Sequence, residues 1–538
     1  MPAFNATGDE PMSYALFPDN KGYFYGHVAF MVLGFWILLP MGIMFGIARS
    51  PFHVPTQILA FLVSTLGFFF GKMYGHSTPH LYAGNSHHTM GWIIYLFFQA
   101  QMSIGVVRKI ANAVARSQQA YQSLHEEETV RLVRSSYPTS PQGDSHSEGS
   151  METLHHTFDD HPKTEEDDDQ AIEQVDSEDD ELLQDPITME KEEPPLWMRP
   201  ILFVLPYIPG FIKASFVTAA YNPFTKTVCR IVHSLLGRVF IILVFAQTLS
   251  GLVVYHGVCR SWDIFPCVAH LIKGGIFFFY GILTFGRYLG AFAEKGWAWN
   301  RVDGGAKFSF ETIECGLIFT YGITNTWMEH FGKDDAWTHK DFEHASLAFM
   351  WWWCGLIGLL VESRALRRLL ERHVLKTPLD ATETKQSYSF NPFPALTVML
   401  TGISMGNHHQ ETQYSTNVHY MWGLLLALAA VSRLATYILI YNSPPSGLQP
   451  GRPPTELIGA FCLIAGSILF MASNTGTMTW MRRLEIDTMF MMNVTIALTS
   501  LTLCYVAFMM ILKAWAMKRE DRKKAAKQSY PDRFVGQA

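Results

Sequence analysis

The chain has 538 residues, of which 49% are hydrophobic and only 16% are charged. Soluble domains carry about 25% charged residues, so this composition excludes one large soluble core and indicates a helical protein that crosses a membrane several times. The formal net charge of -6 says little about partners, because much of the acidic charge lies in one internal segment. We therefore expect the lipid bilayer as the main partner and no nucleic acid.

Eleven apolar stretches follow one another along the chain, and we interpret each as a membrane-spanning helix. They lie at 27–48, 55–74, 89–107, 231–254, 269–290, 309–326, 345–365, 393–408, 418–441, 456–473 and 489–514. When these spans alternate in direction, most Lys and Arg residues of the short loops fall on one side. The positive-inside rule then places residue 1 in the lumen or outside the cell and residue 538 in the cytosol. The predicted fold class is all-α, multi-spanning, with about 11 spans.

Composition also divides the chain into segments. They are a lumenal N-terminal segment (1–26), the first part of a helical core (27–109), an acidic insertion (110–195), an apolar segment with prolines (196–226), the remainder of the core with the following helix (227–290), a C-terminal membrane domain (291–515) and a basic cytosolic tail (516–538). The insertion has few large apolar residues, so we expect it to be disordered. Three prolines and Lys213 interrupt residues 196–222, which we interpret as an interfacial or packed segment that does not span.

Histidines lie at matching depths on the first four predicted spans. His27 begins the first span on the lumenal side, and either His87 or His88 begins the third there. His53 begins the second span on the cytosolic side, and His233 begins the fourth there. A single interfacial histidine is more often a headgroup contact than a ligand. Two imidazoles that converge from neighbouring helices, however, are the axial ligands that a b-type haem requires, and four at paired depths favour ligation.

A glycine follows two of these histidines at an offset of four residues, which places it on the same helix face. Gly91 follows His87 in this way, and Gly237 follows His233. A missing side chain there would leave room for a flat macrocycle. This offset favours His87 over His88 as the ligand on the third span.

These residues resemble the four-helix core of the cytochrome b561 family, over about 27–107 and 231–254. The motifs that carry the resemblance are His27 with Pro40 and Gly42, His53-x-x-x-Gln57, His87-x-x-x-Gly91 ending at Gln101, and His233-x-x-x-Gly237-Arg238. The resemblance implies two b haems, each held by histidines of alternate helices, and electron transfer across the membrane. The acidic insertion, the His87/His88 doublet and Pro55, two residues after His53, depart from the family pattern. The whole arrangement, with a longer helical half behind, looks like the fungal Ytp-type integral membrane proteins.

Cysteines and histidines on the predicted lumenal side suggest two further features. Cys259 and Cys267 share one short loop, so we expect a disulfide if that loop faces an oxidising lumen. Four histidines could converge there to hold zinc, copper or iron, with Glu343 or Glu411 nearby. These histidines are His344, His408, His409 and His419. Their spacing matches no strict metal signature, so histidines satisfied by water or backbone are the favoured interpretation.

Two hypotheses for function follow. The first is a transmembrane electron carrier, and so a possible oxidoreductase, with two b haems that pass electrons from a small cytosolic reductant to a lumenal acceptor. An anionic reductant could be anchored by basic residues beside the cytosolic haem, namely Arg49, Arg108, Lys109 or Arg230. The alternative is a non-redox membrane protein that binds or transports a metal ion through the lumenal histidines. The organelle, endomembrane or plasma membrane, does not follow from the sequence.

Overall fold

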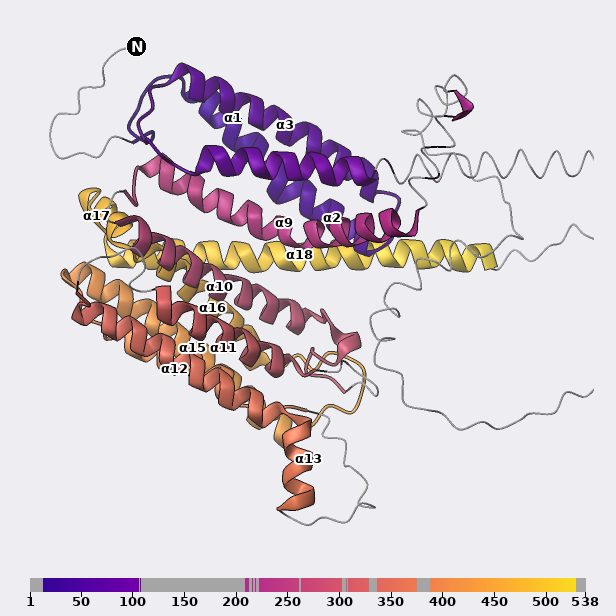
Figure 1. The fold of residues 1–538 in the computed structure, drawn as a ribbon, viewed down its shortest axis with the longest axis vertical. Helices are drawn as coiled ribbons and strands as arrows, with labels where there is room; N and C mark the ends of the chain where they lie inside the picture. Colours follow the sequence, from indigo (N-terminus) through magenta and orange to yellow (C-terminus); the bar gives the residue numbers. More distant parts are fainter. Residues whose placement is uncertain are drawn as a thin grey trace, which may run out of the picture. The chain divides into compact units, whose positions relative to one another are not determined.

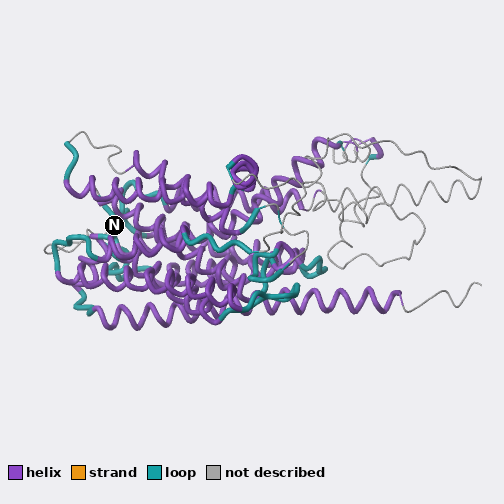
Figure 2. The backbone as a smooth tube through the Cα atoms, turned by 90° about the horizontal axis from the view of Figure 1, so that it is seen from below, coloured by secondary structure: helices purple, strands orange, loops and turns teal. Residues whose placement is uncertain are grey.

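The computed structural model describes residues 13–105, 222–260, 263–301, 308–328, 336–374 and 388–528, with isolated residues between these ranges. Every regular element in these ranges is a helix (Figures 1 and 2). The chain forms two compact units: residues 1–102 with 235–538 make the first, and residues 103–234 the second. The acidic insertion, and most of the segment with prolines, lie outside the described residues.

The first unit begins with a bundle of antiparallel helices. The first predicted span is one continuous helix in three parts, α1 (Lys21–Met31), a π-helical segment η1 (Val32–Leu38) and α2 (Leu39–Ile47). Beside it run α3 (His53–Ser77), a third helix at residues 87–105 and α9 (Pro223–His256), which enters this unit at residue 235 (Figure 1). All of them contribute to one apolar core, which consists of Leu39, Ala60, Ile94, Phe98, Phe240 and Val244.

The π-helical segment of the first span lies directly before a proline. Pro40 has no N–H, so it cannot donate the helical hydrogen bond to the carbonyl of Trp36. That carbonyl instead accepts a hydrogen bond of 2.8 Å from the hydroxyl of Tyr505 on α18 (Thr488–Gln528). The Trp36 indole N–H donates to Thr248 of α9 at 3.0 Å. The irregular turn is thus hydrogen-bonded to two other helices, α9 and α18.

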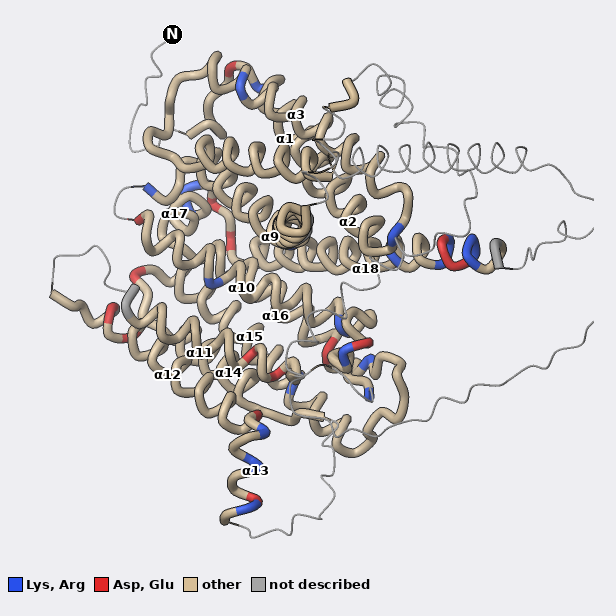
Figure 3. Tube along the Cα trace, turned by 45° about the vertical axis from the view of Figure 1, so that its right-hand side comes forward, with Lys and Arg blue, Asp and Glu red and all other residues tan. Residues whose placement is uncertain are grey.

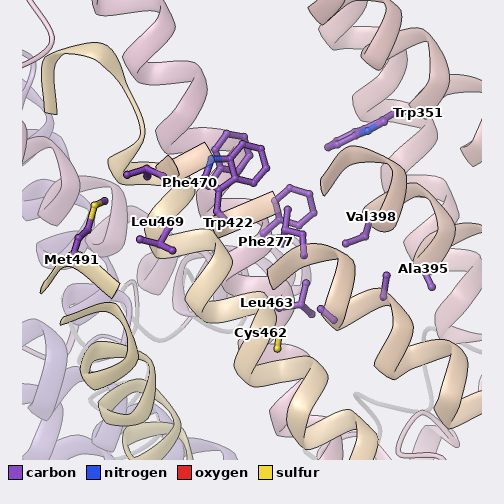
Figure 4. Packing of buried hydrophobic residues seen from close by; sticks show 14 of the residues in the cluster. Phe277, Trp351, Ala395, Val398, Trp422, Cys462, Leu463, Leu469, Phe470 and Met491 are labelled. Atoms are coloured by element: carbon purple, nitrogen blue, oxygen red, sulfur yellow. The ribbon is translucent and has the colours of Figure 1, made fainter. Parts of the chain in front are cut away.

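The second half of this unit is a larger helical body. Its other elements are α10 (Ile264–Leu289), η6 (Ala293–Lys295), α11 (Phe310–Met328), α12 (His339–Glu362), α13 (Arg364–His373), α14 (Phe393–Gly406), α15 (Gln413–Asn442), α16 (Pro454–Ala472) and α17 (Thr475–Arg483). The closest helix pairs are α11 with α12, α10 with α16, and α15 with both α14 and α16. Trp422, Leu426 and Leu469 are fully buried in the core between them; Figure 4 shows Trp422 stacked against Phe470.

Helical residues occupy all eleven of the predicted stretches. Eight of the described helices are long and apolar enough to cross a membrane, and α14 is a shorter apolar helix. The count of eleven spans and their orientation remain predictions. Figure 3 shows Lys and Arg gathered along α13, in the loops near the end of α10 and along the last turns of α18.

A disulfide closes the loop between α9 and α10. It joins Cys259 to Cys267, whose Cα atoms are 5.7 Å apart. The disulfide predicted from the shared loop is therefore confirmed. Beside it, the backbone N–H of Gly476 donates to Asp263 at 3.0 Å, which ties the same loop to α17.

Candidate functional site

The imidazole of His27 is held against the backbone of the neighbouring helix α3. Its Nδ1 lies 2.9 Å from the carbonyl oxygen of Gly67. A carbonyl can only accept, so Nδ1 carries the proton and Nε2 keeps a free lone pair. A Cβ on Gly71, one turn further along α3, would lie 2.6 Å from the same Nδ1. Glycine at position 71 is therefore what allows the ring to reach the α3 backbone.

His53 is held in the same way, in the opposite direction, by the first span. Its Nδ1 lies 2.7 Å from the carbonyl oxygen of Gly42 on α2, and a Cβ on Gly46 would lie 2.9 Å from that nitrogen. Each of the two antiparallel helices thus presents a Gly-x-x-x-Gly pair to the histidine of the other. We refer to these two arrangements, His27 with Gly67 and Gly71 and His53 with Gly42 and Gly46, as the reciprocal histidine clamps.

Pro55 does not disturb the second clamp. Helix α3 begins at His53, so Pro55 lies in its first turn, where the backbone N–H has no partner within the helix. The helix therefore starts at the histidine itself, and Pro55 occupies a position that tolerates proline.

His87 begins the third helix and faces His27. Their ring centroids are 6.5 Å apart and the ring planes are nearly perpendicular, at 88°. The Nδ1 of His87 is 2.9 Å from the hydroxyl oxygen of Ser250 on α9. That hydroxyl donates to the carbonyl of Gln247 at 2.8 Å, so it can accept the Nδ1 proton. A Cβ on Gly251 would lie 3.0 Å from the ring, so α9 also approaches this histidine closely.

This arrangement fits two axial ligands of one iron. Imidazole nitrogens bind metals at about 2 Å, which sets two coaxial ligand rings roughly 6 Å apart between centroids. The observed 6.5 Å between His27 and His87 agrees with that spacing. Ligand histidines usually donate their other N–H to a carbonyl or carboxylate, and such a bond is seen at His27 and a hydroxyl equivalent at His87. The residues present therefore fit a bis-histidine haem.

The glycines beside the histidines differ from those that the sequence singled out. A Cβ on Gly91 would meet the Gln247 amide at 3.2 Å, and one on Gly237 would lie 3.7 Å from the Gln101 amide. In this structure the polar side chain of Gln247 lies beside Gly91, and the role of Gly91 in making room for a macrocycle stays a prediction. The Gln247 amide nitrogen also donates to the His87 carbonyl at 2.9 Å and lies 3.0 Å from its Nδ1 and 3.5 Å from its Nε2.

The remaining two candidate ligands have different surroundings. His88 Nε2 lies 2.7 Å from the amine of Lys72 on α3. His233 belongs to the second compact unit and His53 to the first. Their pairing therefore stays a prediction from sequence.

A repeated spacing could have led the sequence interpretation to Gln247. His87, Gly91 and Gln101 are separated by four and then ten residues, and His233, Gly237 and Gln247 repeat these intervals. In a helix, 14 residues span about 21 Å, so each helix carries a histidine near one end and a glutamine near the other. No comparable signal marks Ser250, because its contact with His87 depends on how α9 packs.

The histidines of the second half that were predicted to be lumenal form two pairs. The rings of His344 and His408 stack with centroids 5.3 Å apart, and His408 Nε2 is 2.7 Å from Glu343. His419 faces His270 of α10 at 6.2 Å and 85°, whereas His409 is exposed. Within the described ranges, no group of three or more His, Cys, Asp or Glu residues is arranged to hold a metal ion. The four predicted ligands therefore do not meet at one point.

Comparison with known proteins identifies the family to which the chain belongs. The family model described as "Protein YTP1-like, C-terminal" matches residues 243–514, and a domain of unknown function, DUF2427, matches residues 8–111. The chain is 34% identical to an uncharacterized membrane protein of Schizosaccharomyces pombe, over 96% of this chain and 99% of that protein. It belongs to the YTP1-like family.

Two relatives from Saccharomyces cerevisiae match parts of the YTP1-like chain. An uncharacterized membrane protein is 35% identical over 54% of this chain and 49% of its own length. Protein YTP1 is 23% identical over 44% of each chain. No solved structure matches. These relatives and the apolar helices make the chain a multi-pass integral membrane protein.

The residues of the candidate site in this YTP1-like protein fall partly in one family match and partly in the other. Residues 8–111 include His27, His53 and His87, whereas residues 243–514 begin inside α9 and include Gln247 and Ser250. The contacts of His87 with α9 therefore join the two matched regions. The resemblance of the first four helices to cytochrome b561 remains a prediction.

Proposed function

We propose that this YTP1-like protein is a transmembrane electron carrier of the cytochrome b561 type that holds two b haems. The facing imidazoles of His27 and His87, 6.5 Å apart and perpendicular, support this proposal more than any other observation. A haem bound there would supply one-electron redox chemistry at its iron. His27 and His87 would hold the haem iron through Nε2, with the Nδ1 of His27 donating to the Gly67 carbonyl and the Nδ1 of His87 beside the Ser250 hydroxyl.

The reciprocal clamp at His53 supports a second haem at the other end of the same helices. His53 is prepared as His27 is, with Nδ1–H donated to a glycine carbonyl. The partner that we assign to it, His233, follows from the depth pairing in the sequence. Two such haems at opposite ends of the bundle would carry an electron from one face of the membrane to the other.

The direction that we propose is from the cytosol to the lumen. The basic loops near the His53 end support a cytosolic position for it, by the positive-inside rule. The disulfide between Cys259 and Cys267 supports a lumenal position for the His27 end, because disulfides persist in oxidising compartments. Arg49 lies in the turn between α2 and α3, four residues before His53, where it could attract an anionic reductant. The side chains of Arg108, Lys109 and Arg230 lie outside the described residues.

Metal binding by the lumenal histidines is the second candidate. It is favoured by the contact between His408 and Glu343, in which a carboxylate orients an imidazole as beside a metal. We place it second because His344 and His408 form one pair while His419 pairs with His270. Unchanged metal content in a triple alanine variant of His408, His409 and His419 would exclude this role.

The test of the haem proposal is a reduced-minus-oxidised absorbance spectrum of the full chain, purified after expression with adequate haem. We expect two b haems per chain. His27→Ala combined with His87→Ala should remove one of them, and His88→Ala, the matched control, should remove none. Absence of haem bands from the unmodified protein would reject the proposal, and a full spectrum in the double variant would reject the lumenal ligands.

A further inference from the structure

Five ionisable side chains from four helices meet inside the second half of the first unit. They are Arg287 of α10, Glu311 and Glu314 of α11, Arg433 of α15 and Glu456 of α16, and each is at most 7% exposed. Charged groups within the spans of a membrane protein are rare and costly, so a cluster of them is a candidate for function. None of the five belongs to the candidate haem site.

Four of these groups compensate one another. Arg433 pairs with Glu456, and its Nη1 lies 3.2 Å from Oε1 of Glu314. The same carboxylate oxygen lies 3.8 Å from Nη1 of Arg287 and accepts a hydrogen bond of 2.8 Å from the hydroxyl of Tyr280. Two guanidinium groups thus lie against two carboxylates, and their charges cancel.

Glu311 is the carboxyl group that remains. It lies three residues before Glu314, on the same face of α11. Among the described residues, no amine or guanidinium lies within 4 Å of its carboxyl oxygens, and the hydroxyl of Tyr437 is 3.5 Å from Oε1. An ionised Glu311 would therefore leave one uncompensated negative charge in the protein interior, which is strongly unfavourable.

The surroundings of Glu311 offset only part of this charge. Glu311 lies in the first turn of α11, where the helix dipole contributes about half a positive charge. It also lines a cavity of about 960 Å³, whose other ionisable lining residues are Arg287, Lys295, Arg301, Glu362, Arg364, Arg367, Arg368, Tyr388 and Tyr437. Three of these, Arg301, Arg367 and Arg368, have other partners. Helix α14, which also packs against α11, carries no ionisable residue.

A proton is the positive charge that fits between the two glutamates. The second carboxyl oxygen of Glu314, Oε2, is buried and has no hydrogen-bond partner among the described residues. Side chains three residues apart on a helix are neighbours, so a protonated Glu311 can supply the missing donor. A metal ion at this place would need several oxygen ligands and would lie against the guanidinium groups of Arg287 and Arg433.

We propose that Glu311 is a proton-binding site, which holds one proton at neutral pH, shares it with Glu314 and exchanges it with the cavity. The basic residues around the cavity place it on the side predicted to be cytosolic. In the other direction along α15, the apolar side chains of Leu426 and Trp422 are fully buried, two and three turns from Arg433. The proton is therefore exchanged with one side of the membrane only.

Loss of this proton changes the balance of the cluster. It leaves two neighbouring carboxylates on α11, and like charges at this spacing repel each other. The first turn of α11 therefore responds to the pH of the compartment that the cavity faces.

The test is infrared difference spectroscopy of the full chain in nanodiscs, titrated from about pH 7 to about pH 10. We expect the carbonyl stretch of one protonated carboxyl group per chain at neutral pH, and its loss as the pH rises. Glu311→Gln, a neutral side chain of the same shape, should lack this band, as should Glu311→Met, which is apolar and of similar size. Glu294→Gln is the matched control, because it removes an exposed carboxylate of the loop after α10 and should retain the band.

Thermal unfolding gives a second measure. An amide at position 311 cannot ionise, so Glu311→Gln should lose less stability than the unmodified protein between about pH 7 and about pH 9. The proposal is overturned if the unmodified protein has no protonated carboxyl group at neutral pH, or if the band persists in both variants of Glu311. It is also overturned if sodium or potassium ions, added at constant pH, abolish the band. The band is expected with or without haem, so this result is independent of the proposed electron carrier.

Discussion

At the scale of single residues, the candidate haem site depends on glycines as much as on histidines. His27 and His53 reach their carbonyl acceptors only because the residue one turn further along the facing helix has no side chain. Each clamp selects the neutral tautomer with a free Nε2, which is the form that binds a metal. The identity of Gly71 and Gly46 should therefore matter for cofactor binding even though neither residue can be a ligand.

Gly71→Leu tests the first clamp. A side chain at this position would occupy the space of the His27 ring, so we expect the lumenal haem to be lost and one of two haems to remain. Gly75→Leu is the matched control, because a Cβ at Gly75 would meet nothing within 4 Å. Haem content per chain, from the absorbance spectrum, measures both. Equal haem loss in the two variants would mean that the effect is general and not due to the clamp.

The sequence indicated the residue types of this site better than their partners. His27 and His87 were predicted from depth along the helices, and they face each other in the structure. Ser250 and Gln247 could not be deduced in the same way, since they lie about 160 positions further along the chain, on a helix whose rotation is set by packing. The ion pairs of Arg287 and Arg433 could not be predicted from the sequence either, because their partners come from other helices.

At the scale of elements, the most informative feature is the π-helical segment of the first span. Hydropathy predicted one helix there and gave no sign of the irregular turn or of its cause. Pro40 removes a backbone donor, and α18, which is more than 440 residues away in sequence, provides the replacement through Tyr505. The backbone carbonyl left without its helical donor in the first span thus forms a hydrogen bond with the last helix, α18.

Tyr505→Phe should destabilise the protein by about 1 kcal/mol, because the Trp36 carbonyl loses a hydrogen bond. Pro40→Ala restores a backbone N–H at the position that normally serves this carbonyl. We therefore expect the double variant to be more stable than Tyr505→Phe alone. Thermal unfolding of the four proteins of this cycle measures the coupling, and strictly additive effects would contradict our account of the turn.

At the scale of the whole molecule, the sequence predicted where helices lie and could not determine how many of them cross. All eleven apolar stretches are helical because length and hydropathy dominate in lipid, where every backbone polar group must be paired within the segment. Helix α14 is too short, at 14 residues, for its role to follow from length alone. Orientation depends on the loops, and the disulfide between Cys259 and Cys267 offers the most direct test.

Removing that disulfide with Cys259→Ser and Cys267→Ser should lower the free energy of unfolding by about 2 kcal/mol, as expected for a short closed loop. In sealed vesicles with the cytosolic face outward, a membrane-impermeant reductant should leave the bond intact until detergent is added. Reduction before detergent would place the loop in the cytosol and reverse the predicted orientation.

The reciprocal histidine clamps have a consequence for the order in which the protein is made. Both belong to one hairpin, α1 to α3, which is translated before the other helices described here and contains one clamped histidine on each of its two helices. His87 follows ten residues after the end of α3, but α9 begins more than 100 residues after the third helix. At 5–20 residues per second, roughly ten seconds separate the two helices during synthesis. His27 and His87 can thus meet before Ser250 and Gln247 exist, and the haem that we propose could be acquired while the chain is still being translated.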